Sequence, residues 1–181
     1  RDSGVGFAIR SKLVDRLEEF PHGISDRLML LRLALSKDRF ASIISVYAPT
    51  QSSSEDVIDQ FYADLGLLIS KVHNDDKLII LGDFNARVGK DASLWQALGK
   101  HGVGNCNSSG LKLLTFCTEH SLFITNTMFQ QKDKYKCTWM HPRSKHWHLI
   151  DYVLVRKRDI KDVTSVRTMR GAECWTDHRL V

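Results

Sequence analysis

The chain has 181 residues, of which 43% are hydrophobic, and its formal net charge is +5 at pH 7. This size and composition favour a single globular domain spanning residues 1–181. The apolar runs are short, so the sequence predicts no membrane-spanning helix, which needs about 20 consecutive apolar residues.

The first half of the chain predicts a strand and then a hairpin. Residues 4–9 read as a strand of small and apolar residues. Two β-prone runs, 27–35 and 40–47, flank a polar tetrapeptide and predict two strands joined by a turn. Pro49 ends the second run, because proline cannot donate a hydrogen bond to a sheet.

Two helices and further strands are predicted after the hairpin. Ser52 followed by Glu55 has the pattern of a capping box, and the apolar positions that follow recur at helical spacing. A buried strand is predicted over 77–81. Ser108 or Ser109 is expected to cap a second helix, whose inward positions are Leu111, Leu114 and Cys117. Strands are predicted at 122–125, 136–140 and 149–155. This order of elements indicates a mixed α/β domain.

The four cysteines are Cys106, Cys117, Cys137 and Cys174, and none of them forms a C-x-x-C pair. Such wide spacing, in a domain large enough to build a core, is typical of reduced and mostly buried thiols. Reduced cysteines favour a nuclear or cytoplasmic location over secretion.

Positive charge is concentrated between residues 132 and 170, a stretch that contains eleven Lys and Arg but only four Asp and Glu. A polyanionic partner is one interpretation, because phosphates release counterions when they bind such a surface. The binding of such a partner would weaken steeply as the salt concentration rises. A basic face that is merely solvated is the alternative, and charge alone does not decide between them.

The segment 81–86 places Asp83 and Asn85 directly after a buried strand. In open α/β sheets, ligands bind at the carboxyl ends of the strands. The carboxylate of Asp83 could take a proton from water or hold a cation, and the amide of Asn85 could orient a phosphate oxygen. The alternative is an Asx turn that only closes the strand.

Three further features carry chemistry more weakly. Asp177 and His178 are adjacent, so one could bind a hard metal and the other the substrate, although a surface Asp-His pair is the simpler interpretation. Asp151 lies within an apolar strand and needs a partner if it is buried, for which a histidine is suited; otherwise it faces solvent at a strand edge. Tyr47 ends a strand and could donate to a phosphate oxygen or pack in the core.

Taken together, the order x-V-Y-A-P, G-D-F-N, I-D-Y-V-L and T-D-H resembles the endonuclease/exonuclease/phosphatase superfamily over nearly the whole chain. The similarity is greatest to the apurinic-type endonuclease domains of RTE-class non-LTR retrotransposons and of proteins derived from them. G-V-G-F at 4–7, the stretch 105–117 and C-T-W at 137–139 also match that group. The resemblance implies a four-layer α/β sandwich, in which two mixed β-sheets lie face to face with helices outside.

The resemblance implies a role for each matching residue. Asp83 would position or deprotonate the attacking water, and Tyr47 and Asn85 would contact the phosphate. Asp177, together with Asp83, would bind Mg²⁺ or Mn²⁺. His178, held by Asp151, would stabilise the phosphoryl oxygens in the transition state. The residues expected to contact nucleic acid are Asn85, Thr138, Lys136 and Arg143.

The sequence departs from the family pattern in three places. Thr176 stands where serine is commonest. The family's strands that carry an Asn and a metal-binding Glu should precede Gly4, and its last strand should continue beyond Val181. The domain is therefore expected to be incomplete at both ends. The available glutamates match neither the position nor the context of the missing one; they are Glu18, Glu19, Glu55, Glu119 and Glu173. We therefore expect this chain alone to be inactive or severely impaired.

The function that the sequence favours is Mg²⁺-dependent DNA endonuclease activity, in which activated water cleaves a phosphodiester. In a complete element, the nick would prime synthesis by a downstream reverse transcriptase domain. A remnant or derived protein that keeps the fold and a basic nucleic-acid-binding surface without catalysis is the first alternative. A phosphatase of the same superfamily is the second.

Overall fold

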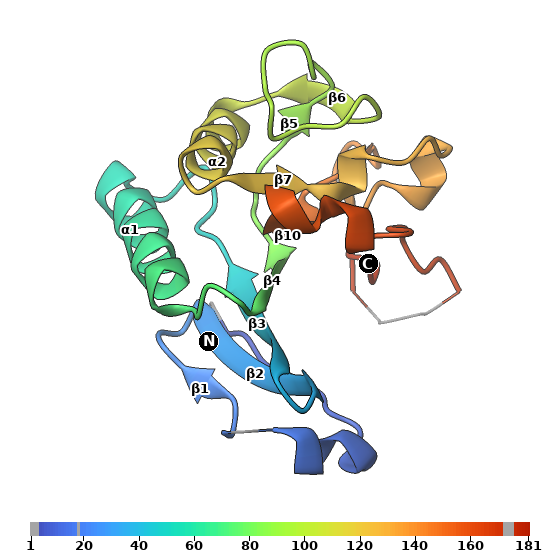
Figure 1. Ribbon diagram of the computed structural model, residues 1–181. Helices are drawn as coiled ribbons and strands as arrows, with labels where there is room; N and C mark the ends of the chain where they lie inside the picture. The colour runs from blue at the N-terminus through green and yellow to red at the C-terminus, as the bar shows by residue number, and fades with distance from the viewer. Residues whose placement is uncertain (1–3, 18, 172–175) are drawn as a thin grey trace.

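A computed structural model describes residues 4–17, 19–171 and 176–181 (Figure 1). Its main element is a six-stranded mixed sheet in the order β1-β2-β3-β4-β10-β7. Two two-stranded pairs, β5–β6 and β8–β9, complete the β-structure of the described residues. The helices are α1 (Glu55–Lys71) and α2 (Ser108–Glu119), with 3₁₀ helices η1 (Ser11–Arg16), η2 (Thr125–Thr127), η3 (Asp133–Tyr135) and η4 (Lys157–Asp162). The strands are β1 (His22–Gly23), β2 (Leu28–Ser36), β3 (Arg39–Tyr47), β4 (Lys77–Asp83), β5 (Val88–Gly89), β6 (Val103–Cys106), β7 (Leu122–Ile124), β8 (Trp139–Met140), β9 (Trp147–His148) and β10 (Asp151–Arg156).

The strand pairing follows from the connections between strands. The predicted hairpin is confirmed, because β2 and β3 pair antiparallel across a tight turn. The long crossover through α1 lets β4 return parallel to β3. On the other side of β4, β10 pairs antiparallel. The carboxyl ends of β3 and β4 therefore meet the amino end of β10 at one edge of the sheet.

The helix α1 is confirmed, but it begins at a different cap from the predicted one. The N-cap residue is Ser54, whose side chain makes no capping hydrogen bond, so the predicted capping box of Ser52 and Glu55 is wrong. Phe61 and Leu65 are buried as the helical spacing predicts. Val57, in the first turn of the helix, is exposed.

The cap of α2 also differs from the prediction. Asn107, rather than Ser108 or Ser109, is the N-cap residue, and its side chain accepts a hydrogen bond from the Gly110 amide. Leu114 and Cys117 are buried as predicted, whereas Leu111 is exposed.

Two predicted strands are absent or shortened within the described residues. Residues 4–10 form no regular element, and of the run 136–140 only Trp139–Met140 is a strand. The thiols of Cys117 and Cys137 are free and buried as predicted, whereas that of Cys106 is free and exposed. Cys174 lies outside the described residues.

One hydrophobic core joins both helices to one face of the sheet, and Figure 1 shows α1 and α2 on that same side. Ile44, Ile80 and Leu154 contribute the sheet side of this core. Their neighbours along the strands, such as Ile79 and Val153, point to the other face, where they are only partly buried.

The α/β class and the mixed sheet are thus confirmed. The second sheet that was predicted to lie face to face with this one would cover its other, partly buried apolar face. That second sheet remains a prediction. None of the helices in the described ranges is long and apolar enough to cross a membrane.

A buried ion pair fixes the turn before β4. The carboxylate of Asp76 is 2% exposed and accepts hydrogen bonds from Arg32 Nε at 2.8 Å and from Ser42 Oγ at 2.7 Å. The hydrogen bond from Arg32 is the main reason that the pKa of Asp76 is lowered, and the bond from Ser42 adds to it against the opposing effect of burial.

Asp76→Asn is expected to reduce the free energy of unfolding at neutral pH by about 2 kcal/mol, because charge-assisted hydrogen bonds are lost. A lowered folded-state pKa stabilises the fold above the unfolded-state pKa, about 3.9, and this stabilisation disappears as pH falls through the folded-state value. Urea unfolding between pH 7 and pH 2 should therefore show a weaker acid dependence for the variant. Parallel curves for both proteins would contradict this assignment.

Candidate functional site

Three chemically active side chains lie in one row across the sheet. The register pairs Tyr47 with Asp83 between β3 and β4, and Asp83 with Asp151 between β4 and β10. Residues directly opposite one another on adjacent strands point to the same face. The sheet therefore collects a phenol and two carboxylates from distant parts of the chain at one edge.

The turn after Asp83 confirms the Asx-turn interpretation of the G-D-F-N segment, and the chemical roles of Asp83 and Asn85 remain predictions. The backbone amide of Asn85 donates to Asp83 Oδ1 at 2.7 Å, which is an Asx turn. Asn85 adopts a φ of 47°, a conformation that asparagine tolerates better than most residues. Its side-chain amide donates to the Ala48 carbonyl at 2.8 Å. The turn therefore fixes both side chains beside the row of Tyr47 and Asp83.

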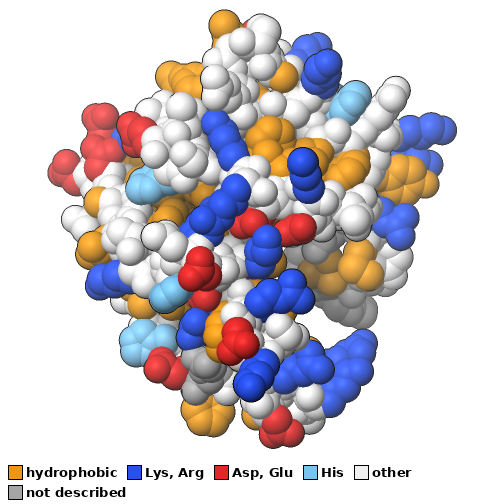
Figure 2. All heavy atoms as spheres, viewed as in Figure 1, with side chains coloured by type: hydrophobic (Ala, Val, Ile, Leu, Met, Phe, Trp, Pro, Cys, Tyr) orange, Lys and Arg blue, Asp and Glu red, His pale blue; other side chains and the backbone are white. Residues whose placement is uncertain are grey.

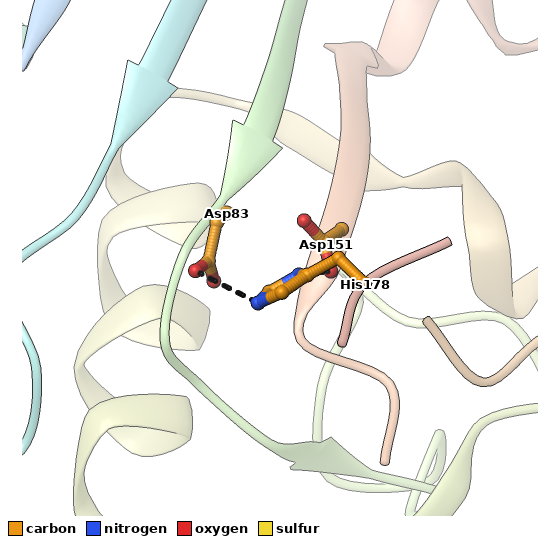
Figure 3. Close-up of side chains that lie close together, drawn as sticks. All are labelled: Asp83, Asp151 and His178. Atoms are coloured by element: carbon orange, nitrogen blue, oxygen red, sulfur yellow. Dashed lines mark hydrogen bonds and ion pairs between the residues drawn. The ribbon is translucent and has the colours of Figure 1, made fainter. Parts of the chain in front are cut away.

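His178 lies between the two carboxylates (Figure 3). Its Nδ1 is 3.0 Å from Asp151 Oδ2, and its Nε2 is 4.0 Å from Asp83 Oδ2. The predicted hydrogen bond between Asp151 and His178 is thus confirmed. Asp151 fixes the orientation of the imidazole, so that Nε2 faces Asp83.

The C-terminal segment reaches the site by pairing with the residues around β8. The amide of Met140 donates to the Asp177 carbonyl at 3.1 Å, and the amide of Arg179 donates to the Thr138 carbonyl at 2.7 Å. The indole Nε1 of Trp139 donates to Asp177 Oδ2 at 2.6 Å. This bond orients the Asp177 carboxylate and leaves its other oxygen for a ligand.

These residues border a cleft of about 770 Å³. Of the six residues predicted to converge, five line the cleft, and Asp151 lies behind His178 as its hydrogen-bond partner. Their proximity is confirmed, whereas their chemical roles remain predictions. The lining residues are Tyr47, Thr50, Gln51, Ser52, Asp83, Asn85, Arg87, Asn107, Trp139, His141, His148, Ile150, Asp177 and His178.

The electrostatics of the site are dominated by crowded negative charge. Burial, followed by the charge of Asp151, raises the pKa of Asp83 to about 6, against the opposing effects of the Asn85 hydrogen bond and of His178. Burial alone would lower the pKa of His178, but the hydrogen bond and charge of Asp151, with the charges of Asp83 and Asp177, raise it. A cation in this cleft would relieve the repulsion between the carboxylates.

The donor atoms suit a hard divalent metal. One ligand atom from each of Asp83, Asp151 and His178 lies within 4.8 Å of the others. Asp177 adds an oriented carboxylate to the same cleft. Mg²⁺ and Mn²⁺ prefer carboxylate oxygens, so the carboxylates of this cleft, rather than the His178 nitrogen, fit the predicted metal. Among the described residues that line the cleft there is no glutamate, and Glu18 and Glu173 lie outside the described residues.

Two of the residues predicted to bind nucleic acid are corrected by their burial. Thr138 is fully buried, and its hydroxyl accepts hydrogen bonds from the amides of Ile150 and Asp151. Lys136 is 8% exposed and donates to the His101 carbonyl. Neither side chain presents a surface to a ligand, because each is used to hold the fold. Arg143 is exposed in the turn between β8 and β9 and remains a prediction.

The basic stretch 132–170 folds back on itself. The amide of Thr168 donates to the Tyr135 carbonyl, and Arg170 lines the same pocket as Lys134 and Arg179. Arg156 and Arg158, at the far end of β10 from Asp151, donate to the Asn74 carbonyl. Figure 2 shows the Lys and Arg side chains spread over the face that carries η4.

Several residues of the cleft were not predicted from the sequence. Among them are the charged Arg87 and the aromatic Trp139. Arg87 follows Asn85 by two residues, so its place in the same turn was a usable signal. The contact between Trp139 and Asp177 had no such signal, because it depends on the pairing of the C-terminal segment with the residues around β8.

Comparisons with known proteins agree with this geometry. The family described as "Endonuclease-reverse transcriptase" matches residues 41–181. Craniofacial development protein 2 is 37% identical over 157 residues in Bos taurus and 36% in Tragulus javanicus, which is 87% of this chain in each case. Those alignments cover 26% and 27% of the relatives, so the chain spans about a quarter of their length.

Two solved structures share the fold at a TM-score of 0.61. The first is the endonuclease domain of TRAS1, a telomere-specific non-LTR retrotransposon, with 14% identity over 86% of this chain and 61% of that one. The second is the 3′ phosphatase NExo from Neisseria, bound to a product DNA hairpin, with 20% identity over 87% and 63%.

Proposed function

Since the chain belongs to the endonuclease–reverse transcriptase family of the endonuclease/exonuclease/phosphatase superfamily, we propose that its cleft is that of a Mg²⁺-dependent DNA endonuclease. The reaction is hydrolysis of one phosphodiester by a water molecule. The observation that carries the proposal is the group of Asp83, Asp151 and His178 at one edge of the sheet, with Asp177 in the same cleft.

The side chains divide the work by their positions. Asp83 accepts a proton from, or orients, the attacking water. His178 donates from Nε2 to a phosphoryl oxygen, while Asp151 holds the opposite ring nitrogen. Tyr47 and Asn85 border the same space and contact the phosphate. Asp83 and Asp177 would hold the divalent metal, which when bound neutralises charge on the phosphate and its leaving oxygen.

The proposal extends to the setting of the activity. DNA is the substrate, and in a longer chain the nick would supply a primer to a reverse transcriptase domain. The free, buried thiols of Cys117 and Cys137 support a location in the nucleus or the cytoplasm. The crowded carboxylates of the cleft support this proposal, and the TRAS1 endonuclease domain, at 14% identity, supports the fold alone.

Metal binding provides a test that does not depend on turnover. Titration of the chain with Mn²⁺ should detect a site, and Asp83→Asn should weaken it by more than the roughly tenfold that is typical of an outer-shell loss. Lys37→Gln is the matched control, because Lys37 is exposed in the turn at the opposite end of β3 from Tyr47. Unchanged binding in Asp83→Asn would contradict the metal site.

Nicking of supercoiled plasmid in Mg²⁺ tests the reaction itself. The assay is run on this chain and on a longer chain that adds the N-terminal strands implied by the family resemblance. The longer chain is expected to nick in Mg²⁺ and to stop in EDTA, whereas this chain alone is expected to nick little or not at all. Metal and DNA binding without nicking in either chain would favour the catalytically inactive alternative. Release of a terminal phosphate without internal nicking would favour a phosphatase, the activity in the name of the Neisseria neighbour.

A further inference from the structure

The cleft contains one guanidinium group that the proposed reaction does not use. Among the described residues that line the cleft, Arg87 is the sole Lys or Arg. Its side chain is exposed, and no carboxylate in the described part of the chain lies within ion-pair distance of it. A cation beside several carboxylates would ordinarily pair with one of them, so its position calls for a different partner.

The backbone of Arg87 is held on both sides by buried residues. Ala86 is 0% exposed and Val88 is 2% exposed. The hydroxyl of Tyr152, which follows Asp151 in β10, donates to the Ala86 carbonyl and accepts from the Val88 amide. The position of Arg87 is therefore tied to the same strand that carries Asp151.

The first turn of α2 fixes Arg87 from a second direction. The amide of Arg87 donates to Asn107 Oδ1, and the amide of Asn107 donates to the Arg87 carbonyl, both at 3.0 Å. Gly110 permits this contact, since a Cβ at that position would lie 1.8 Å from the Arg87 carbonyl oxygen. Gln51 adds an amide to the same wall of the cleft by donating to Ser108 Oγ at 2.9 Å. A rigid backbone thus presents a long cationic side chain beside two amides.

We propose that Arg87, with Asn107 and Gln51, binds a DNA backbone phosphate next to the one that is cleaved. The proposal rests on the proposed function, whose reacting groups line the same cleft. A guanidinium group can donate two parallel hydrogen bonds to a phosphate, and amide side chains can donate further ones. Arg87 also provides the cleft with the positive charge that a polyanion needs to approach a site lined by carboxylates.

The test is DNA binding in the absence of cleavage, measured by fluorescence anisotropy of a labelled duplex in EDTA. Arg87→Gln should weaken binding roughly tenfold at about 0.1 M salt and reduce the slope of log affinity against log salt by about 0.9. Arg87→Lys should recover the slope but only part of the affinity, because lysine keeps the charge without the planar fork. Lys37→Gln removes the same charge far from the cleft and should change neither quantity appreciably.

A scan of neutral methylphosphonates along the duplex identifies the phosphate. At one position next to the cleavage site, neutralisation should weaken binding by the wild-type chain and leave binding by Arg87→Gln unchanged. Equal losses for both proteins at every position would overturn the subsite, as would equal losses for Arg87→Gln and Lys37→Gln. If the plasmid is nicked but no position shows this difference between wild type and Arg87→Gln, the subsite alone is refuted. If one position shows the difference but the plasmid is not nicked, the nuclease activity alone is refuted. Failure to bind DNA at low salt would refute both.

Discussion

His178→Ala is expected to slow phosphodiester cleavage by a factor of roughly 10² to 10⁴, the range for loss of a group that acts in the transition state. His178 Nε2 is the ring nitrogen that faces Asp83 and the cleft, while Nδ1 is bonded to Asp151. A group that acts mainly on the transition state contributes little to substrate binding. DNA affinity should therefore remain nearly unchanged, and single-turnover nicking in the longer chain measures the loss.

Asp151 should matter only through His178. Asp151→Asn is expected to slow cleavage by about 10-fold to 100-fold, as for other residues that orient a catalytic group. The double variant should be no slower than His178→Ala, because two residues that act as a unit give non-additive losses. Fully additive losses would show that Asp151 acts on its own, and near-normal cleavage by His178→Ala would remove His178 from the mechanism.

Gly82→Ala is expected to destabilise the fold by about 3 to 5 kcal/mol, combining backbone strain with overpacking. Gly82 has a φ of +144°, which L-residues with side chains rarely adopt. A Cβ at this position would lie 2.0 Å from the Val46 carbonyl oxygen, so β3 and β4 would have to separate. Because Gly82 directly precedes Asp83, the row of Tyr47 and Asp83 would be displaced as well.

Chemical denaturation of the variant measures this loss, and Gly23→Ala in β1 is the matched control. A Cβ at Gly23 would meet only the end of the Met29 side chain at 3.9 Å, an ordinary contact. That substitution should change the free energy of unfolding by less than about 0.5 kcal/mol. If both glycine variants unfold at the same denaturant concentration, the close approach of β4 to Val46 is not a constraint on the fold.

Local patterns were enough to predict much of the fold. Three elements depend on residues that are neighbours in sequence, so the spacing of apolar residues predicted them directly. They are the hairpin of β2 and β3, the body of α1 and the strand β4. The caps were predicted less well. Ser54 and Asn107 are the N-cap residues of the helices, and several serines nearby offered the same local signal.

The identities of the reacting side chains were also readable from the sequence. Asp83, Asn85, Asp177 and His178 occur in short motifs, and the order of the motifs along the chain indicated the family. Each motif alone also has a structural interpretation, and the order of the motifs along the chain is what favoured the chemical one.

Only the tertiary structure decided which of these groups touch and which are buried. The strand register places Asp83 opposite Asp151, and pairing of the C-terminal segment with Trp139 brings Asp177 into the cleft. The same packing buries Thr138 and leaves the guanidinium of Arg87 exposed in the cleft. Each outcome depends on contacts between residues far apart in the chain, and local sequence patterns do not predict such contacts. The sequence by itself thus determined the chemical groups available, and the fold determined their partners.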